Sequence, residues 1–141
     1  MTEEQESGTQ LLELSNLAWE NGEYFKDREG STFAKVCIRG IDNLFPIRGR
    51  LFENWLSTIY YENKKEIAST KLKSDVMQYL EGMTRILGKT QSVGLRVIGC
   101  DDFIEIDLGD EDWQSVYVTK DGWEVGKHRN RLYRSKGMMD L

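Results

Sequence analysis

The segment from Phe45 to Tyr61 constrains the fold more than any other part of the sequence. It holds the only proline, Pro46, whose ring fixes φ and removes an amide donor, so an extended piece ends there. After it, apolar residues recur at i, i+1, i+4, i+5, i+8 and i+9, which fits one side of a helix and cannot lie on one face of a strand. These residues are Leu51, Phe52, Trp55, Leu56, Ile59 and Tyr60. The segment predicts a helix from about Gly49 to Asn63 at the centre of the core.

Two further helices and several short strands are expected around this one. A short helix begins at Thr9, whose hydroxyl can cap it, and ends at Gly22. Another runs from Ser69 or Thr70 to Leu87, with Gly88 as its stop. Its apolar face is expected to hold Leu72, Val76, Tyr79, Leu80, Met83 and Leu87. Alternation and turn residues predict strands at 23–26, 32–39, 44–47, 93–98, 103–108, 115–119, 123–125 and 132–134, with turns at 40–43 and 120–122.

The expected order of strands, two helices and further strands is typical of an α+β domain. We expect a short N-terminal helix and strands, and a central two-helix hairpin packed on a mostly antiparallel sheet. A chain of 141 residues fits one domain, which we place at 9–141 after a disordered acidic tail at 1–8. In the strand 103–108 we expect Glu105 and Asp107 to share the outward face. For Trp113 and Trp123 we favour burial over an interaction patch.

The composition limits the cell compartment and the cofactors that we expect for this protein. No apolar run approaches the roughly 18 to 20 residues that cross a bilayer, and the acidic, polar N-terminus has no pattern of a secretory signal. Cys37 and Cys100 are far apart in sequence, and no Cys/His spacing suits zinc. We therefore expect a cytoplasmic protein with two reduced thiols, no membrane partner, no metal and no cofactor.

The charge is unevenly distributed along the chain. A formal net charge of −5 argues against a protein whose whole surface grips nucleic acid. Seven acids and no base lie between residues 101 and 113, namely Asp101, Asp102, Glu105, Asp107, Asp110, Glu111 and Asp112. Five bases and no acid lie between residues 127 and 136, namely Lys127, Arg129, Arg131, Arg134 and Lys136. A local basic strip is thus compatible with an acidic total.

The two charged segments carry the candidate chemistry. The basic residues, with Trp123 and Tyr133 nearby, can neutralise the phosphates of a nucleic acid and stack on its nucleobases. Alternatively, they meet the chain's own acidic segment. Paired carboxylates can hold Mg²⁺ for nuclease chemistry, but acids at strand ends and turns are usually solvated. His128 is the only histidine and is expected at the surface. We assign no catalytic residue and no metal ligand.

Several pieces of the sequence together resemble a known family. They are GTQLLELS, EYFKDREGSTFAKV, FPIRGRLFENWLSTIYYEN, LRVIGCDDFIEIDLGDEDWQSVYVTKDGWEV and RLYRSKGMM. In this order and spacing, from about Thr9 to Met139, they are similar to a domain lying just upstream of the helicase-type ATPase in primase-helicase replication proteins of prophages, plasmids and integrative elements. The chain has no GxxxxGK[ST] phosphate loop, so the resemblance does not imply ATP hydrolysis.

The resemblance implies a non-catalytic accessory module of a mobile-element DNA replication protein, contacting DNA or a partner such as a helicase or primase. Its nucleic-acid contacts are expected at Arg48, Arg50, Arg129, Arg131, Arg134 and Lys136. The alternative is a free-standing acidic inhibitor of a host nuclease or defence protein, of the DNA-mimic or anti-CRISPR type. That inhibitor would use the seven acids between residues 101 and 113. Whether the chain is part of a larger ATPase protein stays open.

Overall fold

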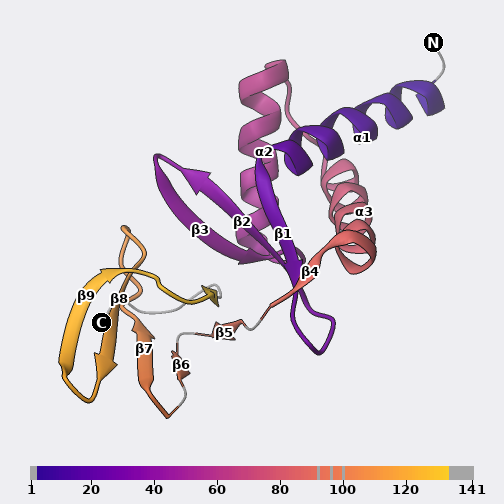
Figure 1. The fold of residues 1–141 in the computed structure, drawn as a ribbon. Coiled ribbons are helices and arrows are strands. Elements are labelled where there is room, and N and C mark those ends of the chain that lie inside the picture. The colour runs from indigo at the N-terminus through magenta and orange to yellow at the C-terminus, as the bar shows by residue number, and fades with distance from the viewer. Residues whose placement is uncertain (1–2, 92, 96, 100, 134–141) are drawn as a thin grey trace.

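A computed structural model of the chain describes residues 3–91, 93–95, 97–99 and 101–133. These residues form an α+β fold with three helices and two four-stranded sheets, plus a two-stranded sheet between them. The helices pack on the first sheet, and the second sheet lies at the opposite end of the molecule (Figure 1). The predicted class, helices on a mostly antiparallel sheet, is confirmed.

The first sheet begins as a meander. Strands β1 (Gly22–Lys26), β2 (Thr32–Ile38) and β3 (Ile41–Pro46) pair antiparallel, and β4 (Lys89–Thr90) joins β1 in parallel. The β2–β3 turn is only Arg39 and Gly40, not the four residues expected. Both have positive φ, 54° and 78°, as in the tight primed turns whose twist matches that of paired strands.

Helix α2 (Arg50–Lys64) follows Pro46 as the sequence predicts. Its buried side chains are Phe52, Trp55, Leu56, Ile59 and Tyr60, which belong to the main core. The apolar stripe is therefore structural. Helix α3 (Thr70–Leu87) begins at Ser69, whose side chain accepts a hydrogen bond from the Leu72 amide at 3.1 Å, and Gly88 follows its end.

Two details of the helices differ from the sequence-based expectation. Helix α1 (Glu3–Glu20) begins at Glu3, not at Thr9, so residues 3–8 of the expected tail form its first turns, and residues 1–2 lie outside the described part. The buried face of α3 is rotated toward Glu81 and Thr84, which leaves Tyr79 and Leu87 exposed. Glu81 can lie on this face because two arginines pair with its carboxylate.

The second sheet is an antiparallel meander of β6 (Val97–Gly99), β7 (Phe103–Asp107), β8 (Gln114–Thr119) and β9 (Gly122–Lys127). The expected hairpin at 120–122 joins β8 to β9. Beyond β9 the chain returns toward the first sheet, where β10 (Leu132–Tyr133) pairs in parallel with β5 (Gly94–Leu95). Residues 128–131, between β9 and β10, are called the strap below. They position the candidate site.

Candidate binding cleft at the strap

The strap is held by a buried carboxylate. Glu105 on β7 is 0% exposed, and its oxygens accept hydrogen bonds from the backbone amides of Arg129 and Asn130, both at 2.8 Å. The Asn130 side-chain amide donates at 2.9 Å, and the Ser115 hydroxyl also donates to Glu105. Hydrogen bonds to an ionised group are about twice as strong as neutral ones. An irregular segment needs such acceptors for its amides, so Glu105 fixes the path of the strap.

A second buried carboxylate anchors the start of the strap. Asp107 is 0% exposed, and its Oδ1 lies 3.1 Å from His128 Nε2 and accepts from the Gly109 amide at 3.1 Å. The His128 ring meets the Trp113 ring at a centroid distance of 5.8 Å, and Trp113 in turn contacts Phe45 at 5.9 Å. This chain of contacts joins the strap to β3 of the first sheet.

The expectation that Glu105 and Asp107 face outward is wrong. Alternation along β7 separates two sets of side chains but does not say which set is covered. The polar set is covered here because the amides and side chains of the strap need acceptors. The apolar set, which includes Ile104 at 47% exposure, is turned outward. The strap thus fits the alternative in which the basic segment meets the chain's own acidic segment, since its contacts are with Glu105 and Asp107.

The acidic run is consequently not one continuous surface. Asp101 and Asp102 are exposed in the β6–β7 turn. At the other end of β7, Asp110 accepts a hydrogen bond from the Gln114 amide at 2.7 Å, and Glu111 and Asp112 are exposed. The five residues of β7 separate the two groups by roughly 16 Å, at about 3.3 Å per residue.

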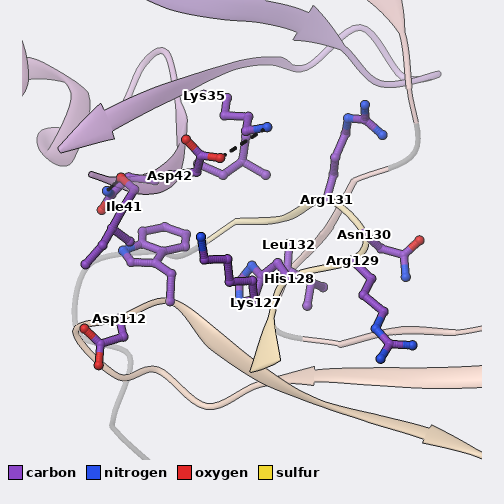
Figure 2. A pocket seen from close by; sticks show the side chains of 13 residues that line it. Lys35, Ile41, Asp42, Asp112, Lys127, His128, Arg129, Asn130, Arg131 and Leu132 are labelled. Atoms are coloured by element: carbon purple, nitrogen blue, oxygen red, sulfur yellow. Dashed lines mark hydrogen bonds and ion pairs between the residues drawn. The ribbon is translucent and has the colours of Figure 1, made fainter. Parts of the chain in front are cut away.

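A cleft of about 230 Å³ lies between the strap and the first sheet (Figure 2). The residues that line it come from β2 and β3, from the turn before β8, and from the strap with its two neighbours. They are Lys35, Ile41, Asp42, Asn43, Leu44, Asp112, Trp113, Lys127, His128, Arg129, Asn130, Arg131 and Leu132. Four of these side chains are cationic and two are carboxylates, so the cleft is basic although the chain is acidic.

The cations differ in how they are engaged. Lys127 and Arg131 are exposed, and neither has an ion-pair partner among the described residues; the Arg131 guanidinium lies 5.5 Å from the centre of the Phe25 ring. Lys35 lies 3.6 Å from Asp42 in an exposed pair. Arg129 pairs with Glu124 at 2.8 Å and lies over the Tyr117 ring. Figure 2 shows Arg129 and Arg131 pointing in opposite directions, which leaves Arg129 outside the group of free cations.

The other basic residues expected in a nucleic-acid site lie elsewhere or outside the described part. Arg48 pairs with Glu81 of α3, which also pairs with Arg85 at 3.2 Å. Arg50, at the first residue of α2, lies 3.9 Å from Glu53. Neither arginine lines the cleft. Two expected residues, Arg134 and Lys136, fall outside the described residues.

Sequence reasoning missed Lys35 as a partner of the strap. Arg131 lies over Phe25, and Tyr133 contacts Phe33 at 4.9 Å, so the strap and β10 cover this face of the first sheet. Lys35 lies two residues after Phe33 on β2 and thus shares that face. Nothing local in the sequence marks this meeting, because β2 and the strap are far apart along the chain. The sequence feature that does point to this cleft is the strip of basic residues between residues 127 and 136.

No protein-family model, curated protein or solved structure matches this chain. Within the described ranges, no group of three His, Cys, Asp or Glu side chains is arranged to hold a metal ion. Of the helices in the described part, none is both long and apolar enough to cross a membrane.

Proposed function

We propose that this chain is a non-catalytic module that contacts single-stranded nucleic acid through the cleft beside the strap. The observation that carries the proposal is the convergence of Lys35, Lys127 and Arg131 on one cleft of a chain whose net charge is −5. A cluster of cations on an acidic protein makes a local positive potential, and phosphates are its natural ligands. The resemblance to a replication-protein domain supports the same class of ligand.

The size of the cleft favours part of a nucleic-acid strand over a free small molecule as the ligand. At about 230 Å³ it is smaller than the ~300–1,000 Å³ typical of small-molecule sites. One phosphate with its sugar enters such a space, while the neighbouring nucleotides lie on the exposed cations. The Arg131 guanidinium is pre-positioned by its contact with the Phe25 ring, which lowers the entropy lost when it binds a phosphate.

The wider role that we propose is an accessory one. The module would hold DNA for a helicase or primase activity carried elsewhere, in the cytoplasm of a cell that harbours a phage, plasmid or integrative element. The acidic-inhibitor alternative has less support, because two of its seven residues, Glu105 and Asp107, are buried and engaged with the strap. We therefore propose that the basic cleft, and not the acidic segment, carries the function.

Fluorescence anisotropy with a labelled oligothymidylate, titrated at several salt concentrations, tests the proposal. Three phosphate contacts on a single strand predict that log K falls against log salt with a slope of about −2, at about −0.7 per contact. The double variant Lys127→Glu, Arg131→Glu is expected to bind at least ~10-fold more weakly and to flatten the slope, since two of three contacts become repulsive.

Lys120→Glu is the matched control, because Lys120 is exposed in the β8–β9 turn at the far end of the second sheet. It changes the net charge by two units without touching the cleft, as the single cleft variant Arg131→Glu does, and is compared with that variant. Binding that is absent at low salt would refute the nucleic-acid role. Equal losses in Lys120→Glu and in Arg131→Glu would show that only net charge matters, and would refute the site.

A further inference from the structure

The second sheet presents a face made only of apolar side chains over most of its width. The strand register places Val97 opposite Ile106, Ile104 opposite Val118, and Val116 opposite Val125. Val118 is also opposite Trp123. The face is called the apolar face below and comprises Val97, Ile104, Ile106, Val116, Val118, Trp123 and Val125. It is opposite to the face that carries Glu105 and Asp107, because side chains alternate along β7.

The apolar face is open to solvent in the described part of the chain. Trp123 is 70% exposed, and Val97, Val125 and Ile104 are 50%, 49% and 47% exposed. The expectation that Trp123 is buried is thus wrong, whereas Trp113 is buried as expected. With up to ~250 Å² for a whole Trp and less for each aliphatic residue, the exposed apolar area is on the order of 400 Å². Patches of this size on a monomer are often interaction sites.

We infer that the apolar face is the interface of a homodimer, in which two second sheets pack face to face. Flat sheet faces pack about 10 Å apart with their strands nearly aligned, and a twofold axis makes one face complementary to itself. Homodimer interfaces are roughly 65% apolar, so ~400 Å² of apolar area corresponds to about 600 Å² per copy with its polar rim. About 1,200 Å² in total is at the lower end of specific interfaces. Because the interface is this small, we expect the dimer to dissociate reversibly.

The charges around the apolar face disfavour two other occupants. Asp101, Asp102 and Asp121 are exposed in the turns at one end of the second sheet. They repel nucleic acid and anionic lipid headgroups. Lys127, at the other end, lines the cleft. The features that favour a second copy are the apolar area and the complementarity of one face to itself across a twofold axis.

Sedimentation-velocity centrifugation of the full chain over a concentration series tests the dimer. The wild type is expected to shift from one to two chain masses with a midpoint in the micromolar range. Trp123→Lys and Ile104→Lys each place a charge in the buried interface and are expected to weaken association at least ~10-fold.

Ile86→Lys is the matched control, because Ile86 is 81% exposed on α3, remote from the second sheet. Its association is expected to equal that of the wild type. Circular dichroism and urea unfolding check that each variant is folded; a variant that fails is replaced by Val125→Lys on the same face. A wild type that stays monomeric to about 100 μM overturns the inference. So does a dimer that survives the lysine substitutions in the apolar face.

Discussion

Replacing Glu105 with glutamine keeps the size of the side chain but removes the buried charge that holds the strap. One glutamine oxygen can still accept from the amide and side chain of Asn130, now as neutral hydrogen bonds worth about 1 kcal/mol less each. The glutamine amide group then faces the Arg129 amide, another donor, which is left buried without an acceptor at a cost of about 1–3 kcal/mol. The Ser115 hydroxyl can rotate to accept. The sum is a loss of about 3–5 kcal/mol, a large part of the 5–15 kcal/mol of a typical domain.

Urea unfolding followed by tryptophan fluorescence measures this loss, and amide hydrogen exchange locates it. Exchange is expected to accelerate most at the amide of Arg129, which loses its acceptor, and less at the amide of Asn130, whose hydrogen bond is weakened. Glu111→Gln is the control: Glu111 is exposed in the same acidic run, so its variant is expected within about 0.5 kcal/mol of the wild type. If Glu105→Gln is as stable as Glu111→Gln, the claim that Glu105 organises the strap is refuted.

Two further predictions concern the helices. Ser69→Ala removes the side-chain acceptor of the Leu72 amide at the start of α3 and is expected to cost about 1 kcal/mol in urea unfolding, with Ser74→Ala, inside the same helix, as a control that leaves the cap intact. The Tyr24 hydroxyl donates to the Ala18 carbonyl at 2.5 Å near the end of α1, and burial raises the pKa of Tyr24 above its usual range. Because the unfolded chain releases this proton near pH 10 while the folded chain keeps it, stability falls above about pH 10 by up to ~1.4 kcal/mol per pH unit. Tyr24→Phe is expected to remove that part of the slope between about pH 9 and pH 11; an unchanged slope would contradict the assignment.

The features that sequence reasoning predicted well are local. Helix α2 begins after Pro46 because proline and the apolar spacing act within a few residues, and α3 runs from the Ser69 cap to Gly88 for the same kind of reason. The turn residues at 120–122 likewise define the β8–β9 hairpin. The bases of the strap were visible as a strip of charge. For the candidate site, however, only Arg129 and Arg131 of the four expected residues that the structure describes line the cleft, and Arg129 points away from it.

By itself, then, the sequence determined where the main helices begin and end, the α+β order of elements, and the separation of acids from bases. Only the tertiary structure decided that the polar face of β7 is the covered one, and that Lys35 joins Lys127 and Arg131 around one cleft. The physical reason is that periodicity divides a strand into two faces but contains no information on what packs against either. That choice depends on the amides of the strap, which lie more than twenty residues farther along the chain and need the carboxylate of Glu105 as their acceptor.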